Sequence, residues 1–216
     1  MKKNRDSDFM GKVEYKDFVQ TLKETSVDTD HNDEQGDNIY MTESLKEVIN
    51  FDNFLEAYFK NENTKARKPD SVDAYCFLDS RPCLIEFKNG KIDGKVNREI
   101  HSKIGHSVSV ILMNENIIPA KFKNNAILIL VYNRERAFKK KSDNDLGEAR
   151  YLKPKEAIVS PSFDMIRTHL GKKQGKPIVS FRLDTYEGKY FSKVMTMDKS
   201  IFNEYIEKHM ITLPVK

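Results

Sequence analysis

Residues 126–132 of the 216-residue chain read AILILVY, an unbroken run of apolar side chains rich in β-formers. A strand with one face in water alternates between apolar and polar residues, whereas a strand buried on both faces is apolar throughout. The run therefore predicts a strand that is buried on both sides. Only a fold that covers both faces of a sheet can accommodate it.

The segments before this strand alternate between helical and strand patterns. Residues 41–60 predict an amphipathic helix with a capping box at Ser44 and Glu47. Its apolar positions are Leu45, Val48, Ile49, Phe54, Leu55, Tyr58 and Phe59, with Phe51 at the margin. Next, VDAYCFL and CLIEFK, separated by the turn residues DSRP, predict a β-hairpin. A second helix is expected over residues 96–116, with Ile100, Ile104, Val108, Ile111 and Leu112 on one face.

The two ends of the chain have weaker patterns. Helical spacing over residues 13–22 is followed by a polar, acidic stretch, 25–38, which predicts a flexible loop. Near the C-terminus we expect a short helix within 160–176 and a strand at 177–184. A last helix at 198–210 should be capped by Asp198 and turn four apolar residues inward: Ile201, Phe202, Tyr205 and Ile206.

The length of the chain suits a single domain with a sizeable core. We divide it into an N-terminal helix and acidic loop, a core, and a basic loop with C-terminal elements that complete the same domain: residues 1–40, 41–133 and 134–216. No stretch approaches the roughly 18 consecutive apolar residues of a membrane span, and the N-terminus lacks the apolar core of a secretory signal. We therefore expect no membrane association and a cytoplasmic location. Cys76 and Cys83 lie in apolar runs without metal-ligand spacing, so we expect reduced packing residues and no zinc site.

The net charge of +4 is modest, but the basic residues are concentrated in one region. Residues 120–176 contain 14 Lys and Arg against 6 Asp and Glu. The densest part directly follows the apolar strand and contains the candidate nucleic-acid-binding residues Arg134, Arg136, Lys139, Lys140 and Lys141. Such a region can neutralise backbone phosphates in a salt-sensitive way. A solvated basic loop is the alternative interpretation.

The hairpin carries charged residues where a buried strand normally excludes them, because burying an unpaired charge is costly. A turn centred between Ser80 and Arg81 pairs residues whose numbers sum to 161, which places Asp73 opposite Lys88 and Tyr75 opposite Glu86. Residues that oppose each other, or lie two apart, project from the same face of a sheet. Asp73, Glu86 and Lys88 should thus share one face, while the other face holds Ala74, Cys76, Ile85 and Phe87.

Two carboxylates and an ammonium group at one end of a hairpin suit phosphodiester hydrolysis. Asp73 and Glu86 offer oxygen ligands for Mg²⁺, which needs only one or two protein carboxylates. Lys88 can orient or help deprotonate the attacking water and stabilise charge on phosphorus. An ordinary cross-strand ion pair between Asp73 and Lys88 is the alternative.

These residues resemble the PD-(D/E)XK nuclease superfamily, whose motif is an acid opening one strand and Glu-x-Lys ending the next, followed by a helix and a buried strand. The resemblance covers about residues 41–133. It implies an α/β (α+β) fold with a central mixed sheet flanked by helices, the restriction-endonuclease-like core. It also implies Mg²⁺-dependent cleavage of DNA, less often RNA, with Mn²⁺ as a substitute, and by analogy a homodimer.

The resemblance implies a role for each site residue. Asp73 and Glu86 become metal ligands and Lys88 the catalytic lysine, while family members often add an acid from the first helix, for which Glu56 or Glu43 is available here. A polar residue from the second helix is expected as well. Of the polar stripe Glu99, Ser102, Lys103 and His106 we select Lys103.

Two features depart from the family pattern. Its usual three-stranded meander requires a further strand, which must be very short before Asp73 or lie elsewhere. Asp70, after Pro69, is a second candidate for the motif acid, but parity favours Asp73. The sequence leaves three function classes open: a nuclease of restriction, repair or mobile-element defence, a catalytically silent nucleic-acid-binding module, and an interaction protein whose charges provide solubility.

Overall fold

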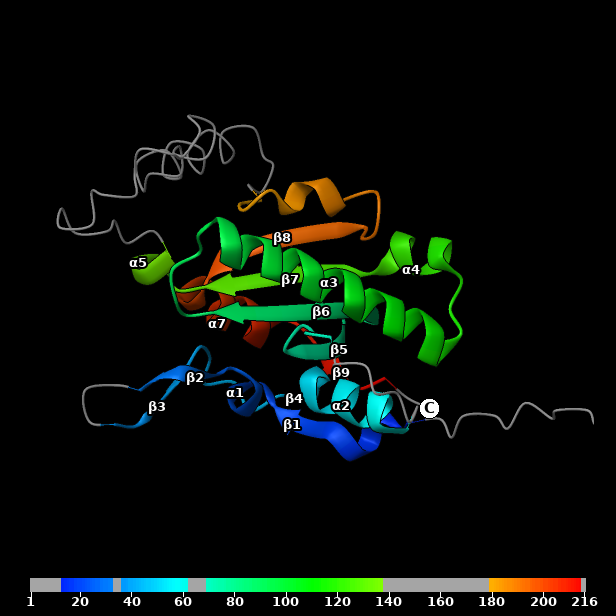
Figure 1. Cartoon of the computed structure of the whole chain (residues 1–216), viewed down its shortest axis with the longest axis horizontal. Coiled ribbons are helices and arrows are strands. Elements are labelled where there is room, and N and C mark those ends of the chain that lie inside the picture. Colours follow the sequence, from blue (N-terminus) through cyan, green and yellow to red (C-terminus); the bar gives the residue numbers. More distant parts are fainter. Residues whose placement is uncertain (1–12, 33–35, 62–68, 138–178, 215–216) are drawn as a thin grey trace, which may run out of the picture.

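The computed structural model describes residues 13–32, 36–61, 69–137 and 179–214. Within these ranges, seven strands form one mixed sheet flanked by helices, which confirms the α+β class (Figure 1). The strand order is β1-β4-β5-β6-β7-β8, and β9 pairs with β5. The strands are β1 (Val19–Thr21), β4 (Glu47–Asn50), β5 (Ala74–Leu78), β6 (Arg81–Lys88), β7 (Ile127–Tyr132), β8 (Lys193–Asp198) and β9 (Ile211–Thr212). All three sections into which we divided the chain contribute strands to this sheet.

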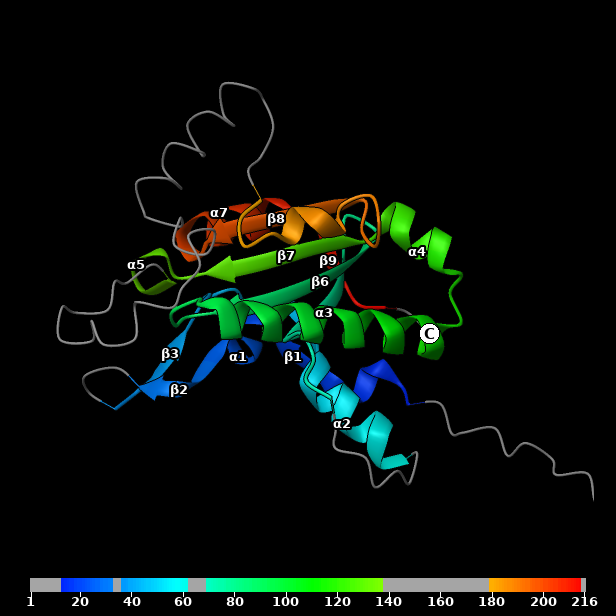
Figure 2. The same ribbon diagram turned by 45° about the horizontal axis from the view of Figure 1, so that its top comes forward.

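The sheet changes from antiparallel to parallel pairing at β6. β4, β5 and β6 form an antiparallel meander, whereas β6, β7 and β8 are parallel. The parallel connection from β6 to β7 runs through the long helix α3 (Gly94–Glu115) and the shorter α4 (Pro119–Asn125), and α3 lies across the sheet (Figure 2). β6 therefore has neighbours on both edges, and its side chains can leave the sheet only through its two faces.

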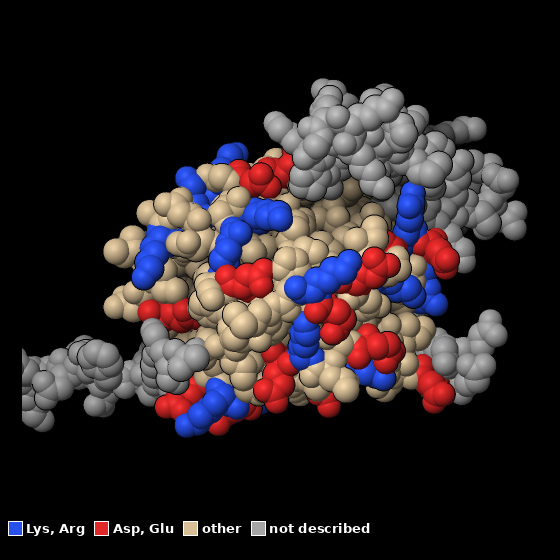
Figure 3. Space-filling view, turned by 180° about the vertical axis from the view of Figure 1, so that it is seen from behind, with Lys and Arg blue, Asp and Glu red and all other residues tan. Residues whose placement is uncertain are grey.

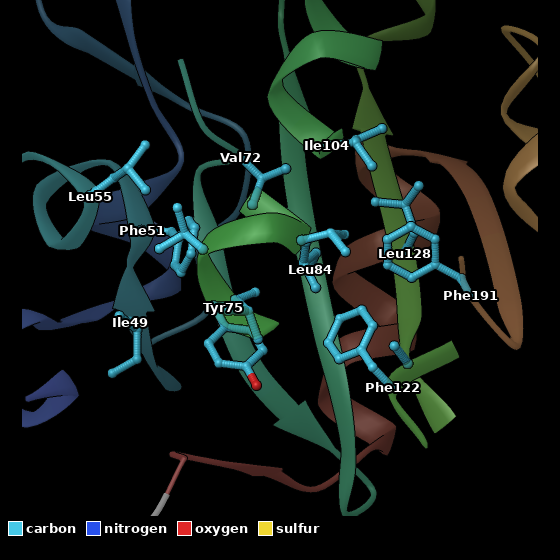
Figure 4. Packing of buried hydrophobic residues seen from close by; sticks show 14 of the residues in the cluster. Ile49, Phe51, Leu55, Val72, Tyr75, Leu84, Ile104, Phe122, Leu128 and Phe191 are labelled. Atoms are coloured by element: carbon cyan, nitrogen blue, oxygen red, sulfur yellow. The ribbon is translucent and has the colours of Figure 1, made fainter. Parts of the chain in front are cut away.

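Each face of the sheet has its own apolar layer. One layer joins Tyr75, Leu84 and Leu128 to residues of α3 and of α2 (Phe51–Asn61), as the side chains in Figure 4 show. The other joins the alternate strand positions to Phe202 and Ile206 of α7 (Lys199–Lys208). All six residues of β7 are buried; Leu128 and Leu130 belong to the first layer, and Ile127, Ile129 and Val131 belong to the second. The prediction of a strand covered on both sides is confirmed.

The predicted helix over residues 41–60 is wrong in its first half. Residues 47–50 form strand β4, and only from Phe51 onward is the segment helical. Val48 and Ile49 are β-branched residues that pair with β1, and Ile49 also pairs with Tyr75 of β5. Ser44 and Glu47 therefore form no capping box. β4 supplies the third strand of the meander, so in the sequence that strand precedes α2 and does not directly precede Asp73.

The N-terminal predictions are also corrected. Instead of one helix over residues 13–22, the chain forms the 3₁₀ turn η1 (Tyr15–Phe18), strand β1 and the short helix α1 (Leu22–Thr25). A capping box does occur here, between Thr21 and Glu24. The stretch predicted as a flexible loop contains the hairpin strands β2 (Val27–Asn32) and β3 (Asn38–Tyr40). Polar composition concealed these strands.

At the C-terminal side, the helix capped by Asp198 is confirmed, with Phe202 and Ile206 buried. Ile201, predicted to face inward, is 58% exposed. Strand β8 was not predicted, and residues 179–184 form no strand but lead into the 3₁₀ turn η4 (Leu183–Tyr186). The helix expected within 160–176 lies outside the described residues.

The two cysteines lie in the core of the sheet. Cys76 and Cys83 are free and fully buried, and they face each other across β5 and β6. They are packing residues of the sheet's second apolar layer. In the part of the chain that the structure describes, no helix has the length and apolar character needed to cross a membrane.

The hairpin register differs from the predicted one by two residues. Leu78 pairs with Arg81, so the turn consists of Asp79 and Ser80, and paired numbers sum to 159. Both turn residues have positive φ angles, 49° and 65°, as a two-residue type I′ turn requires. Because the shift is even, every side chain keeps its predicted face. One step beyond the Ala74–Ile85 pair, Asp73 stands level with Glu86, where Lys88 was expected.

This turn generates a prediction about stability. A non-glycine residue in the left-handed region costs about 1–2 kcal/mol, which glycine avoids. Ser80→Gly should therefore raise the free energy of unfolding by about 1 kcal/mol, or the melting temperature by about 2–4 °C. Urea and thermal unfolding measure this. Ser102→Gly, at an exposed position inside α3, is the control and should lower the free energy by about 0.5–1 kcal/mol. A loss of stability in Ser80→Gly would contradict the assigned turn.

Candidate active site

The predicted charged residues meet at the end of β6, on the face of the sheet that α3 covers. The Glu86 side chain is fully buried, whereas those of Asp73, Lys103 and Lys88 are 18%, 16% and 24% exposed. Lys88 ends β6, Asp73 directly precedes β5, and Lys103 reaches in from α3. The four residues that the sequence analysis named as catalytic thus form one cluster at the rim of the core.

Lys103 lies between the two carboxylates. Its Nζ is 3.0 Å from Oε1 of Glu86 and 3.5 Å from Oδ1 of Asp73. Lys88 Nζ lies 3.3 Å from the same Glu86 oxygen. The backbone N–H of Phe87 donates to Oδ2 of Asp73 at 2.6 Å, which holds this carboxylate beside the strand. In place of the simple cross-strand ion pair between Asp73 and Lys88, which was the alternative interpretation of the sequence, the described residues form a network centred on Lys103 and Glu86.

One oxygen of this network is left over. Oε2 of Glu86 is buried, and no group within the described ranges donates a hydrogen bond to it. Buried polar atoms without a partner are rare and costly, because they lose water without replacing its hydrogen bonds. A ligand that offers positive charge or a donor would satisfy this atom.

Burial and mutual repulsion change the proton affinities of the cluster. Desolvation, then the neighbouring Asp73, raises the pKa of Glu86 to about 7, although Lys103 and Lys88 act in the opposite direction. Desolvation also raises the pKa of Asp73, against the effect of Lys103. Burial acts to lower the pKa of Lys103, but the two carboxylates outweigh it, so its pKa is raised and the ammonium stays charged.

The acid that α2 contributes is Asp52. Its charge raises the pKa of both Asp73 and Lys103, and it accepts a hydrogen bond from the hydroxyl of Ser71, two residues before Asp73. Glu56, one of the two acids that the sequence analysis offered for this role, is half-exposed and pairs with Lys60 at 2.5 Å. Asp52 lies one helical turn before Glu56, so both acids occupy the same face of the helix and the spacing does not distinguish them.

The remaining candidates from the sequence lie elsewhere. Glu43 is exposed and pairs with Lys23 at 2.6 Å. Asp70 is exposed, so Asp73 and not Asp70 joins the cluster. Val72 anchors this stretch, because its N–H donates to the buried hydroxyl of Ser107 in α3 at 3.0 Å.

Hydrogen bonds hold two further segments at the same end of the sheet, where β6 and β7 finish. Asn89, directly after Lys88, donates to Asp28 of β2 at 2.7 Å and accepts from Asn133 at 2.8 Å. Asn133 in turn precedes α5 (Arg134–Ala137). The hairpin β2–β3 and α5 are therefore both held beside the end of β6 (Figure 1).

Of the basic candidates, Arg134 and Arg136 lie on α5, with Arg134 exposed. Lys139, Lys140 and Lys141 lie outside the described residues. On the face that lies behind the view of Figure 1, the described Lys and Arg side chains are mixed with Asp and Glu (Figure 3). The described residues visible on that side form no continuous basic surface.

The cluster meets the minimum that Mg²⁺ requires. Among the described residues no group of three or more His, Cys, Asp and Glu side chains could hold a metal ion. Magnesium, however, is commonly bound by one or two carboxylates, and water and phosphate supply the other ligands. Asp73 and the unsatisfied oxygen of Glu86 therefore fit Mg²⁺ in the chemistry of their donor atoms.

The raised pKa of Glu86 makes stability depend on pH. Between the ordinary glutamate pKa of 4.5 and about 7, the folded protein holds a proton on Glu86 that the unfolded chain releases. Raising the pH through this interval therefore lowers the free energy of unfolding. In metal-free buffer, wild type should lose about 1–3 kcal/mol across the interval relative to Glu86→Gln, which has no such proton.

Urea unfolding at a series of pH values, with chelator present, measures this difference. Glu56→Gln is the matched control, because its exposed carboxylate should leave the wild-type profile unchanged. Parallel profiles for wild type and Glu86→Gln would show that Glu86 titrates normally.

A scan of protein-family models, a search of curated proteins and a search of solved structures each find no match for this chain.

Proposed function

We propose that this protein is a metal-dependent nuclease that hydrolyses phosphodiester bonds, with DNA as its substrate in preference to RNA. The observation that carries the proposal is the fully buried Glu86, with an unpartnered oxygen, beside Asp73 and two lysines. Buried polar atoms without a partner are few in native proteins, so a carboxylate oxygen of this kind beside a second acid favours a bound cation over a purely structural ion-pair network. The meander β4-β5-β6, followed by α3 and the parallel strand β7, also agrees with the PD-(D/E)XK resemblance.

Asp73 and Glu86 would hold the Mg²⁺ or Mn²⁺ ion. When bound, such an ion supplies Lewis acidity that activates water and neutralises phosphate charge. Asp52 is placed to influence the cluster through its charge and through Ser71.

Lys88 is the residue best placed to act on the reacting groups. It ends β6 at the rim of the sheet and is the most exposed of the four, so its ammonium can face a phosphate and the attacking water. There it would orient the water and stabilise the negative charge that develops on phosphorus. Lys103, less exposed and in contact with both carboxylates, would hold them in position.

The nucleic acid would approach the edge of the sheet where β6 and β7 end. The hairpin β2–β3 and α5 lie beside this edge, and Arg134 with Arg136 begins the basic region that would bind phosphates. We further propose a cytoplasmic protein, in keeping with two free cysteines, and a homodimer for cutting both strands. Restriction, repair and mobile-element defence are the settings in which the resemblance places such an enzyme.

A second candidate function is a catalytically silent nucleic-acid-binding module. It is favoured by Lys103 and Lys88, whose two ammonium groups already balance the two carboxylates without a metal. In that case the cluster would serve only to stabilise the fold.

Nicking of supercoiled plasmid in Mg²⁺ or Mn²⁺ tests the leading proposal. Asp73→Asn and Lys88→Met should each lower the rate by at least about 100-fold, because each removes a group that binds the metal or stabilises the transition state. Binding of a labelled duplex in chelator should persist in both variants. Glu56→Gln is the control and should nick at the wild-type rate. Full activity in Asp73→Asn would refute the assignment, and binding without cleavage in any metal would favour the silent module.

Metal-dependent thermal stabilisation gives a test that does not depend on activity. Because the Lys103 ammonium occupies the space between the carboxylates, a cation must compete with it. Lys103→Met should lower the melting temperature without metal and shift the stabilising Mn²⁺ concentration down by about tenfold, since close charges interact by several kcal/mol in a partly buried site. Glu86→Gln should abolish the metal effect. If neither wild type nor Lys103→Met is stabilised by metal, the cluster holds none.

A further inference from the structure

A second feature lies across α3 from the carboxylates. A groove of about 480 Å³ runs between α3, α4 and the segment from η4 to Tyr190. Its floor is apolar and includes Ile104, Val108 and Leu112 of α3. The C-terminal half of α3 and α4 lie at the same end of the molecule in both ribbon views (Figures 1 and 2).

Two tyrosines form one wall of the groove. The rings of Tyr186 and Tyr190 are 5.6 Å apart, and Tyr186 also stacks at 5.1 Å on His101 of α3. The His101 ring nitrogen and the Tyr186 hydroxyl lie 2.7 Å apart, so Tyr186 is fixed against the helix. Tyr190 is 53% exposed, and its ring is available to a flat partner.

The charge of the groove is of one sign. Lys123 and Lys189 line it, and the described lining residues include no carboxylate. Apolar floor, exposed aromatic ring and ammonium groups are together the elements by which proteins bind unpaired nucleotides, with bases stacked and phosphates neutralised. An apolar peptide would leave both ammonium groups without an acidic partner among the described lining residues.

Gly105 is the position where a ligand in the groove could come closest to the backbone of α3. It lies inside α3 on the exposed side and lines the groove, yet a Cβ built there would meet nothing within 4 Å. A glycine inside a helix costs about 1 kcal/mol relative to alanine. The described neighbours do not require this space. A glycine here would let a ligand approach the helix backbone closely.

We propose that this groove binds an unpaired stretch of nucleic acid, with a base stacked on Tyr190 and phosphates beside Lys189 and Lys123. Gly105 is two residues from Lys103, so the groove and the carboxylates lie on opposite sides of one helix, about 10 Å across. The inference rests on the proposed function and deepens it, because the preferred substrate then contains a single-stranded region that crosses α3 at Gly105.

Binding of labelled single-stranded DNA, single-stranded RNA and duplex DNA by the full chain, in chelator and low salt, tests the proposal. Single strands should bind more tightly than duplex. Tyr190→Ala should weaken single-strand binding by about tenfold, since one stacked base is worth about 1–3 kcal/mol. Lys189→Glu should weaken it too, and its effect should shrink as salt rises.

Gly105→Leu separates binding from folding. The side chain has open space in the free protein and favours the helix, so the melting temperature should stay the same or rise, while single-strand binding falls by about tenfold or more. Ile201→Ala and Lys208→Glu, at exposed positions of α7 on the other side of the sheet, are the controls and should bind like wild type.

The outcomes distinguish the two proposals. Normal binding by Tyr190→Ala and Gly105→Leu, or no binding of single strands by wild type, would overturn the groove assignment even if plasmid is nicked. If wild type binds single strands but cuts nothing in any metal, and these variants bind more weakly, the groove assignment is supported and the nuclease proposal is refuted.

Discussion

The burial of the Glu86 carboxylate is the constraint on which the rest of the site depends. Glu86 lies in a strand that is paired on both edges, so its side chain cannot turn to solvent without breaking the sheet. An isolated buried carboxylate is unstable, and here Lys103 and Lys88 compensate for it from α3 and from the same strand. A second acid, Asp73, repels the Glu86 carboxylate, so the cluster needs a second positive charge. The cluster is therefore balanced only by groups brought from three segments of the chain.

The change from antiparallel to parallel pairing at β6 makes this assembly possible. Antiparallel pairing brings the beginning of β5, with Asp73, level with the end of β6. The parallel connection to β7 then returns α3 across the same face, which places Lys103 over both carboxylates and the opposite side of α3 along the groove. Because β7 is buried on both sides, this crossover helix is held firmly against the sheet. One helix thus serves both candidate binding regions.

The membership of the site could largely be predicted, because alternation along a strand is a local property. Asp73, Glu86 and Lys88 share a face in any register that differs by an even number, so the two-residue error at the turn did no harm. Lys103 could be selected as a polar residue of the helix that follows. Asp52 was missed, because the sequence pattern extended the helix over residues 41–60 and gave no reason to prefer one acid within it.

The sequence by itself determined the buried strand at 126–132, the long helix α3 and the face on which the charged residues lie, since periodicity and β-propensity act over a few residues. Only the tertiary structure decided that residues 47–50 are a strand, because Val48 and Ile49 fit a helix equally well until β1 and β5 pair with them. It alone decided the central place of Lys103, the unsatisfied oxygen of Glu86 and the groove beside Tyr190. These depend on contacts between segments far apart in the chain, which no local pattern records.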